Sequence, residues 1–411
     1  MESADSKRQK KRRMSKYDTI VIGGGVAGLV AGIALLERGQ RAALCASGRS
    51  CLNYFSGSFD LYAEGLEGVE RLLAQGEEIH PYAKVGTERI VRHTQRIKDI
   101  FASAGVPLQG SVEKREYRLT PLGVLKPSWL TLQGFATFEQ LENLACKRVA
   151  VVGIEGYLDF NPEFVARPFR CRGIGCACHS VSLSDTKKSA LCPIGRALAE
   201  ELAGKIVAEI GDSDLVLLPA IFDMYNREAF DALVAIVGDR VRLVPTASAS
   251  IVGESVQRAL KCRFVALGGE FFEGDRVVAV EECEGVVVAV RTVSGATLRA
   301  DNFVLATGGF FGGGVVGSRE RVYEPLVNLD VAAATNRADW TSEKLFSAQP
   351  FEKFGVVTDV ELHPSKQGAS LCNLYAVGAL LAGADGVSEG SGGGIALCSA
   401  LLAAEMIAKR N

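Results

Sequence analysis

The chain has 411 residues, which is long enough for two or three domains and a large buried core. Hydrophobic residues make up 48% of it and charged residues 23%, so composition excludes a mainly disordered protein. Its 46 Lys and Arg residues nearly balance its 48 Asp and Glu residues, and the net charge of −2 argues against a basic nucleic-acid-binding protein and against a strongly acidic chain.

The first 16 residues are basic, and we predict that they form a disordered tail. Seven of them are Lys or Arg, and an uncharged stretch of 18 residues, Thr19–Leu36, follows. This order is also typical of a signal peptide or a membrane anchor, but the stretch contains five glycines and no small-residue cleavage pattern follows it. An alternative role for the tail is contact with an anionic membrane surface, at about 1 kcal/mol per basic residue. We otherwise expect no membrane span.

A strand, a glycine-rich turn, a helix and a second strand are predicted next. Tyr17–Ile22 is an apolar strand, Leu29–Arg38 is helical with Gly39 as its stop, and Arg41–Ala46 is the second strand. The turn reads Gly-Gly-Gly-Val-Ala-Gly, which fits G-x-G-x-x-G. Such a loop brings the backbone and a helix N-terminus close to a phosphate. We therefore predict dinucleotide-type binding by three of its glycines, Gly23, Gly25 and Gly28.

The middle of the chain has a mixed pattern, which we interpret as an α/β region inserted between two halves of a nucleotide-binding domain. Lys147–Gly153 and Leu215–Pro219 are predicted strands, and Ser250–Leu260 is a predicted helix. The expected division is a tail (1–16), a discontinuous Rossmann-like flavin-binding domain (17–75 and 261–411) and an inserted α/β domain (76–260).

Three short strands and a second glycine turn follow the inserted region. Arg276–Cys283, Gly285–Val290 and Thr297–Ala300 are predicted to form a β-meander. Asp301–Gly309 is a buried strand that ends in paired glycines. These glycines could simply form the turn that ends the strand. We prefer the alternative that the backbone at Gly308 comes close to the cofactor a second time.

The C-terminal segment repeats this arrangement. Asn373–Gly378 is a predicted strand, and Gly390–Gly394 opens an apolar, buried helix over Ile395–Lys409. A flexible linker would explain the glycine run, but a buried helix directly after it favours a site for an anion or an electron-rich atom. The expected cofactor-binding positions here are Gly378, Gly392, Gly393 and Gly394.

Three separated glycine sites with a meander before the second resemble the fumarate-reductase type of flavoprotein with two dinucleotide-binding domains. More specific strings occur in the order Ser56–Leu61, His80–Tyr82, Thr120–Gly123, Val152–Ile154, Phe354–Asp359 and Gly390–Gly394. With them, residues 17–409 resemble the B-type subunits of anaerobic glycerol-3-phosphate dehydrogenases.

This resemblance implies a function and partners. The family oxidises sn-glycerol 3-phosphate to dihydroxyacetone phosphate and passes the electrons to a quinone. The B-type subunit is the flavin subunit, with FMN as its expected cofactor, and works beside an FAD-bearing A-type subunit and a membrane-bound, iron–sulfur C-type subunit. The implied location is cytoplasmic and peripheral to the inner membrane through these partners. Ser56, Gly57 and Ser58 join the expected cofactor-binding residues.

The second strand bears on the choice between FMN and FAD. Proteins that bind a dinucleotide with this loop place Asp or Glu about 20 residues past the glycines, where the carboxylate binds the adenosine ribose. Ala46 occupies that place here. Loss of one such contact removes roughly 1.5–3 kcal/mol. FMN has no adenosine, so we predict FMN, with FAD as the alternative.

The 11 cysteines are odd in number and irregularly spaced, which predicts reduced thiols in a cytosolic setting, most of them in the core. Cys171, Cys176, Cys178 and Cys192 fit neither iron–sulfur nor zinc spacing, and we predict no metal site.

The sequence assigns no catalytic residue. His80 lies in a matched string and is a structural histidine or a base, whereas His93 stands between Arg92 and Arg96 and is expected on a solvated helix face. The side chains that could bind a substrate phosphate are Arg118, Lys126, Arg258 and Arg263, although each also fits a plain surface role. Two other functions stay open, namely a non-catalytic subunit for electron relay or assembly and an independent fumarate-reductase-like oxidoreductase.

Overall fold

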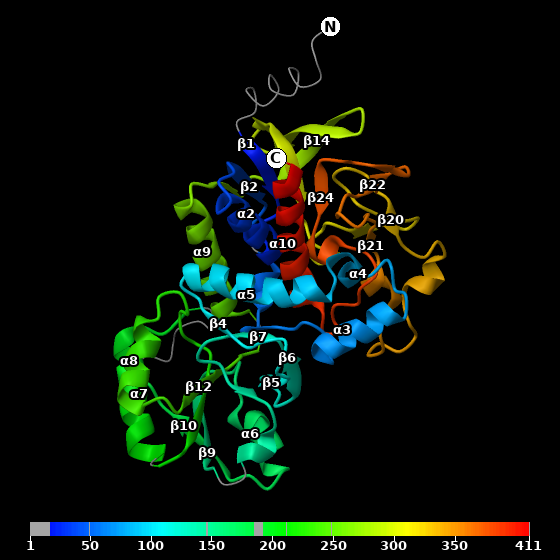
Figure 1. Cartoon of the computed structure of the whole chain (residues 1–411). Coiled ribbons are helices and arrows are strands. Elements are labelled where there is room, and N and C mark those ends of the chain that lie inside the picture. The colour runs from blue at the N-terminus through cyan, green and yellow to red at the C-terminus, as the bar shows by residue number, and fades with distance from the viewer. Residues whose placement is uncertain are drawn as a thin grey trace. The chain divides into compact units, whose positions relative to one another are not determined.

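The computed structural model describes residues 17–48, 50–144, 147–184, 192–210, 212–247 and 249–410, so the predicted tail lies outside the described residues. The chain divides into two compact units (Figure 1). Unit 1 contains the described residues up to Cys51, Leu61–Ile100 and those from Leu260 onward, and unit 2 contains Leu52–Asp60 and Phe101–Ala259. The limits predicted from the sequence were residues 75 and 260, and the second of these lies next to the point where unit 1 resumes, at Leu260.

Unit 1 is built on a five-stranded parallel sheet with the order β13–β2–β1–β17–β24. The strands are β1 (Tyr17–Ile22), β2 (Ala42–Ala46), β13 (Glu270–Glu273), β17 (Ala300–Leu305) and β24 (Leu374–Ala376). The chain places β2 and then β13 on one side of β1, and β17 and β24 on the other side. The strand order therefore reverses at β1, and loops at the carboxyl ends of β1 and β17 are the expected place for a ligand.

Two apolar helices, α2 (Val26–Leu36) and α10 (Gly392–Arg410), pack against each other in unit 1 (Figure 1). Ten of the 11 residues of α2 are buried, because small and aliphatic side chains face the strands and α10 alike. Helix α10 is long and apolar enough to cross a membrane, yet 67% of its most apolar window is buried inside the protein. It is therefore built like a core helix, as predicted from its sequence.

The meander and several shorter elements complete unit 1. Strands β14 (Val277–Cys283), β15 (Val286–Thr292) and β16 (Thr297–Leu298) form the predicted antiparallel sheet. The helices α3 (Gly65–Ala74), α4 (Pro81–Val85) and most of α5 (Thr87–Ser103) also belong to unit 1. Three two-stranded ribbons follow β17, namely β18 with β19 (Val316–Gly317, Val322–Tyr323), β20 with β21 (Val331–Ala332, Gly355–Val356) and β22 with β23 (Ser365–Lys366, Ala369–Ser370).

Unit 2 contains a four-stranded parallel sheet with the order β10–β9–β11–β12. Its strands are β9 (Val149–Ile154), β10 (Cys176–Val181), β11 (Leu215–Pro219) and β12 (Val241–Val244), and its helices are α6 (Pro162–Arg170), α7 (Arg196–Ile210), α8 (Glu228–Val237) and most of α9 (Ile251–Ala266). Val151, Phe169 and Leu217 are fully buried in its core. Strands therefore alternate with helices, which confirms the predicted α/β character of this region.

Two small antiparallel sheets also belong to unit 2. The first has the order β3–β7–β4 and the second the order β6–β5–β8. Their strands are β3 (Ser58–Phe59), β4 (Leu108–Gln109), β5 (Glu116–Leu119), β6 (Leu125–Ser128), β7 (Leu130–Leu132) and β8 (Thr137–Phe138). Residues that stand opposite each other in an antiparallel pair share one face of the sheet, as do Arg118 of β5 and Lys126 of β6.

Candidate functional site

The first glycine loop joins β1 to α2 by close backbone packing. Gly23 has φ +119°, and a Cβ atom there would lie 2.2 Å from the carbonyl oxygen of Ala306. A Cβ atom at Gly28 would lie 2.0 Å from the carbonyl oxygen of Gly23. Real side chains never come so close, so both positions require glycine for the fold itself. The loop after β17 thereby lies directly against the loop after β1.

Gly25 differs, because its Cβ position faces open space within the described part of the chain, with no other atom within 4 Å. It is the N-cap residue of α2, with φ −74° and ψ 177°, and none of the described side chains caps this helix end. The first turn of α2 also lacks an acidic residue. Its backbone N–H groups and the positive end of the helix dipole therefore suit an anion such as a phosphate.

The second loop offers a polar atom close to the first glycine loop. Thr307 follows β17, and its buried Oγ1 has no hydrogen-bond partner among the described residues. The backbone N of Thr307 lies 3.2 Å from the position of a Cβ on Gly23, and Gly308 has φ +81°. A buried hydroxyl without a partner is costly unless a ligand or water satisfies it. Sequence reasoning named Gly308 but missed Thr307, although a threonine between a buried strand and two glycines is a usable signal.

The third loop lies beside the start of α2 as well. Gly378 has φ +75°, and a Cβ atom there would come within 3.1 Å of the Cβ of Ala27. Its N–H donates to Oγ of Ser399 on α10 at 2.9 Å. The structure therefore brings Gly23, Gly25, Gly308 and Gly378 to one edge of the unit 1 sheet.

The glycines that open α10 have different surroundings. A Cβ atom at Gly394 would lie 2.2 Å from Oη of Tyr82, so this glycine packs against a buried side chain. Gly392 is exposed and has only ordinary contacts at its Cβ position, and Gly393 is half-buried. The first turn of α10 has no acidic residue. Gly392 and Gly393 are thus the two glycines of this run that remain accessible.

Comparison with known proteins identifies the family of this chain. The FAD binding domain family matches residues 18–395. The B-type subunit of anaerobic glycerol-3-phosphate dehydrogenase from Yersinia pestis is 35% identical over 95% of this chain and 98% of that protein. The protein of the same name from Actinobacillus pleuropneumoniae is 33% identical over 95% and 99%. This chain belongs to the family of anaerobic glycerol-3-phosphate dehydrogenase B-type subunits. The predicted resemblance and the flavin-binding fold are thereby confirmed.

In this dehydrogenase subunit, Ser56, Gly57 and Ser58 belong to unit 2. Gly57 has φ +83°, and a Cβ atom there would lie 2.5 Å from the ring of Phe135. The hydroxyl of Ser58 is buried and shares a hydrogen bond of 2.9 Å with Thr131. Both residues thus have packing roles within unit 2, and their contact with the cofactor stays a prediction.

The end of β2 has no carboxylate in this dehydrogenase subunit. Ala46 is 2% exposed, and Glu273 is its partner in register on β13. Oε2 of Glu273 accepts a hydrogen bond of 2.6 Å from Nζ of Lys261. Asp275 also lies near this end of the sheet, since its charge adds to the burial that raises the pKa of Cys45 on β2. Glu273 is the register partner of Ala46, so it is the residue that would replace the missing ribose contact if FAD were bound.

The histidine at the start of α4 in this dehydrogenase subunit has structural partners. His80 is the N-cap of α4, where its Nδ1 accepts from the N–H of Tyr82 and its Nε2 lies 3.2 Å from Oε2 of Glu389. Burial raises the pKa of Glu389, but hydrogen bonds from His80, the Asp385 backbone and Ser391 outweigh it and hold that pKa below its usual range. A buried cap with both ring nitrogens engaged fits the structural alternative better than a base.

The prediction for His93 was wrong. This histidine lies on α5 but is only 2% exposed, and its Nε2 lies 3.0 Å from Oε1 of Glu405 on α10. Its ring shares a helix face with the buried side chains of Ile90 and Ile97, three and four residues away. The charged neighbours in sequence point elsewhere on the helix.

The four candidate phosphate-binding cations of this dehydrogenase subunit differ in their partners. Arg258 pairs with Asp223. Arg263 donates to Glu37 at 3.1 Å, and its Nε is buried without a partner among the described residues. Arg118 is only 14% exposed, and its Nη2 donates to Oδ2 of Asp60 at 3.2 Å. Nε of Arg118 and Oδ1 of Asp60 are buried without partners among the described residues. Lys126 lies opposite Arg118 in the register of β5 and β6. The Arg118 site therefore combines a second cation with a donor and an acceptor that have no partner in the described part of the chain.

The expectation that most cysteines are core residues was also wrong. Of the ten cysteines within the described residues, only Cys45 and Cys398 are buried. Cys176 and Cys178 lie on β10, and Nη2 of Arg170 is 3.1 Å from Sγ of Cys178. Burial is the main cause that raises the pKa of Cys176 to about 12 and that of Cys178 to about 11, so these thiols stay protonated at neutral pH. Cys171 and Cys192 are exposed.

Proposed function

We propose that this chain is the flavin-carrying subunit of an enzyme that oxidises sn-glycerol 3-phosphate to dihydroxyacetone phosphate and passes the electrons to a quinone. The family membership over 95% of the chain supports this proposal. A bound flavin would accept the hydride that leaves the secondary alcohol carbon. The chain's own residues would hold the cofactor and exclude water around it.

The proposed cofactor contacts follow from the geometry of the three loops. The uncapped start of α2 at Gly25 would receive the phosphate, and the orphan hydroxyl of Thr307 would donate to the same ligand. Gly392 and Gly393 at the start of α10 would face the flavin ring, where reduction increases negative charge. Gly23, Gly28, Gly308 and Gly378 would shape the cradle through close backbone packing.

We propose FMN as the bound flavin. The match to an FAD binding domain supports a flavin and leaves the choice between the two open. Ala46 gives no charge at the position where a carboxylate would bind the adenosine ribose. Glu273 is already paired with Lys261, which weakens its candidacy as a substitute.

We further propose Arg118 and Lys126 as the side chains that bind the substrate phosphate. An arginine with an unused N–H and an opposite lysine form a site that suits a phosphate dianion. Burial raises the pKa of Asp60, against the lowering effects of Arg118 and Lys126. Arg118→Gln is expected to raise the KM for glycerol 3-phosphate at least tenfold in the assembled enzyme. Arg258→Gln is the matched control, because Arg258 pairs with Asp223 and not with a residue of the β5–β6 hairpin. This variant should leave the KM for glycerol 3-phosphate within twofold of the wild-type value.

The proposed partners are an FAD-bearing A-type subunit and a membrane-bound, iron–sulfur C-type subunit, which would hold this chain at the cytoplasmic face of the inner membrane. The name of its relatives, which makes each of them one subunit of a dehydrogenase, supports a complex of several chains. Co-expression of the three chains tests the assembly. The proposal predicts one stoichiometric complex in which glycerol 3-phosphate reduces a quinone, and loss of that activity when this chain is omitted.

Two other functions make different predictions for the same preparation. A subunit for electron relay or assembly would carry a flavin that substrate reduces only when the partners are present. An independent fumarate-reductase-like oxidoreductase would reoxidise its reduced flavin with fumarate in the absence of any partner. Reduction of the isolated chain by glycerol 3-phosphate, without reoxidation by fumarate, supports the proposed catalytic role against both.

A further inference from the structure

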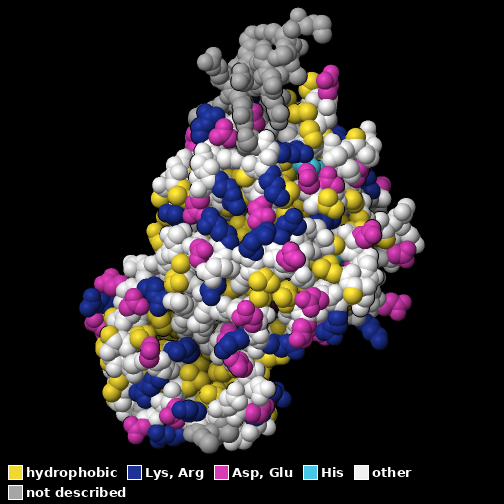
Figure 2. Space-filling model, in the orientation of Figure 1, with side chains coloured by type: hydrophobic (Ala, Val, Ile, Leu, Met, Phe, Trp, Pro, Cys, Tyr) yellow, Lys and Arg dark blue, Asp and Glu magenta, His cyan; other side chains and the backbone are white. Residues whose placement is uncertain are grey.

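A basic pocket lies in unit 1 at the ends of α2 and α10 that are remote from the glycine loops. Figure 2 shows Lys and Arg side chains gathered around acidic ones over the region where Figure 1 places α5 and α10. The pocket has a volume of about 690 Å³. It is lined by Arg38, Val85, Gly86, Thr87, Glu88, Arg89, Arg92, Glu405, Ala408 and Lys409, and we call it the α5–α10 pocket.

The α5–α10 pocket is separate from the cofactor cradle. Glycines begin both helices at the cradle, whereas Arg38 follows the last turn of α2 and Lys409 lies in the last turn of α10. Gly392 and Glu405 are 13 residues apart on α10, which corresponds to roughly 20 Å along the helix axis. A ligand in the pocket would therefore not contact the flavin.

The lining of the α5–α10 pocket has an excess of positive charge. Four cations face two carboxylates, Glu88 and Glu405. Glu405 is already engaged by His93 at 3.0 Å, and this hydrogen bond is the main cause that keeps the pKa of Glu405 below its usual range. Arg89 and Arg92 approach Glu405 only to 3.8 Å and 3.6 Å, which exceeds hydrogen-bond distance. Arg38 and Arg89 each also donate one hydrogen bond to a backbone carbonyl oxygen, those of Ala34 and Val85. Two carboxylates and these two carbonyls leave further donors of the four cations unused.

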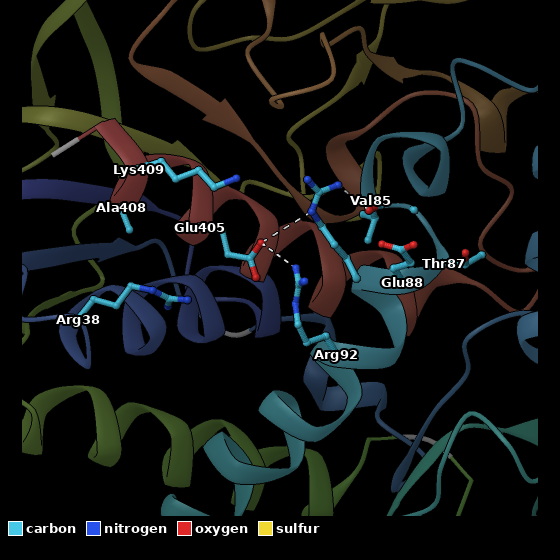
Figure 3. A pocket seen from close by; sticks show the side chains of 10 residues that line it. Arg38, Val85, Thr87, Glu88, Arg92, Glu405, Ala408 and Lys409 are labelled. Atoms are coloured by element: carbon cyan, nitrogen blue, oxygen red, sulfur yellow. Dashed lines mark hydrogen bonds and ion pairs between the residues drawn. The ribbon is translucent and has the colours of Figure 1, made fainter.

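Several donors of the α5–α10 pocket remain unused. Within the described residues, Arg92 makes no hydrogen bond, and Lys409 makes neither a hydrogen bond nor an ion pair. Burial lowers the pKa of Arg38, and the nearby positive charge of Arg96 lowers it further. Figure 3 shows Arg38, Arg92 and Lys409, from three different segments, extending toward Glu405. The arrangement leaves guanidinium and ammonium groups crowded around a hollow.

We propose that the α5–α10 pocket binds a phosphate group, either of a free phosphate ester or of an anionic phospholipid headgroup. Arginine forks and a lysine match the several acceptor oxygens of an anionic phosphate group. Thr87 and Glu88, the first residues of the 17-residue helix α5, line the same hollow, and the N–H groups at a helix start have no intrahelical partner. The N–H of Gly86, before this helix, already donates to the carbonyl oxygen of Tyr82 at 2.8 Å. The cationic side chains of the pocket and the N-terminal end of α5 would thus bind the same phosphate group. This site is independent of the proposed catalytic function.

The test compares the full-length chain with two doubly substituted variants of equal net charge. Arg92→Gln with Lys409→Gln removes the two cations with unused donors. Arg319→Gln with Lys344→Gln removes two exposed cations of unit 1 outside the pocket and is the matched control. All three proteins keep residues 1–16, so any contribution of the basic tail is the same in each. The probes are inorganic phosphate, measured by calorimetry, and sedimentation with vesicles of phosphatidylglycerol and phosphatidylcholine or of phosphatidylcholine alone.

The proposal predicts that the pocket variant binds inorganic phosphate at least tenfold more weakly than the wild type, whereas the control stays within twofold. If the pocket variant also loses binding to phosphatidylglycerol vesicles, the source is a lipid headgroup, and if vesicle binding is equal in all three proteins, the source is a free phosphate ester. Equal phosphate binding in the pocket variant and the control overturns the proposal. So does a pocket variant that binds phosphate normally but fails to assemble with its partner subunits, since the surface is then a protein interface.

Discussion

Gly24 lies directly against Ala46, because a Cβ atom at Gly24 would come within 2.7 Å of the Cβ of Ala46. The first glycine loop and the end of β2 therefore pack as one surface, with Ala46 only 2% exposed. A side chain at Gly24 would collide with Ala46, so this loop position requires glycine. Ala46 itself gives no carboxylate for the contact that normally recognises an adenosine ribose.

The first prediction is that the bound flavin is FMN. Heat release of the flavin from the purified protein, followed by chromatography, should give FMN in a ratio close to one per chain. Stoichiometric FAD would contradict this prediction. In that case Glu273→Gln should lower FAD occupancy, because Glu273 is the register partner of Ala46 and would supply the ribose contact instead.

The second prediction separates cofactor binding from folding within one loop. Gly25→Val should lose the flavin while the chain stays folded, because the new side chain enters space that no described atom occupies. Gly28→Val should instead destabilise the fold by about 1–3 kcal/mol or more, because its Cβ would lie 2.0 Å from a backbone oxygen. Flavin absorbance per chain and thermal unfolding by circular dichroism measure both effects. Full flavin occupancy in folded Gly25→Val protein would refute the assignment of this helix end.

The third prediction concerns the start of α10. Gly393→Val should shift the flavin reduction potential or expel the flavin, because the helix dipole at this end stabilises added negative charge by roughly 0.3–1 kcal/mol. Gly394→Val should lower the unfolding temperature, since its Cβ would collide with Tyr82. A spectroelectrochemical titration of both variants distinguishes the two roles. An unchanged potential and unchanged occupancy in Gly393→Val would place the helix start away from the flavin.

The fourth prediction is a pH dependence of stability that depends on Lys84. Its Nζ donates to the carbonyl oxygen and the hydroxyl of Thr358, at 2.9 Å and 2.8 Å. Burial lowers the pKa of Lys84 from 10.5 to about 8, against an opposing effect of Asp359. The folded protein thus releases this proton more readily than the unfolded chain, so the contribution of Lys84 to stability rises from about pH 8 to pH 10.5.

Lys84→Met removes this titration and provides the comparison. The wild type should gain about 1–2 kcal/mol in the free energy of unfolding relative to Lys84→Met as the pH rises across that range, after allowance for partial exposure. Urea unfolding of both proteins at about pH 7.5 and about pH 10 measures the difference. A constant difference between them, or a relative loss by the wild type, would contradict the lowered pKa.

The local elements of the site were predictable from sequence because local rules determine them. The strand over Tyr17–Ile22 matches β1, and the helix after it begins three residues earlier than expected, since Gly25 is already its N-cap. The strand over Leu215–Pro219 and the buried helix α10 follow from apolar runs between turns. The spacing of the glycines indicated all three loops, because only glycine, which has no Cβ, lets the backbone come so close to another group.

Other features depended on contacts that are distant in sequence. His93 has charged neighbours in sequence but lies on the buried face of α5. Only the residues three and four positions away, which share that face, indicate that it is buried. The role of Gly394 depends on Tyr82, and the unused polar atoms of Asp60 and Arg118 depend on a hairpin more than 50 residues further along the chain than Asp60. Cysteine exposure was also misjudged, because a small thiol is compatible with core and surface alike.

Anaerobic reduction of the protein-bound flavin by sn-glycerol 3-phosphate tests the central claim most directly. The purified chain, alone and then with its two partner subunits, is mixed with substrate in a stopped-flow spectrometer, and flavin absorbance is followed before any quinone is added. We predict that the flavin of this chain bleaches in both preparations and that sn-glycerol 1-phosphate bleaches neither. A flavin that stays oxidised in the complete complex at saturating substrate would contradict a role of this chain in glycerol 3-phosphate oxidation.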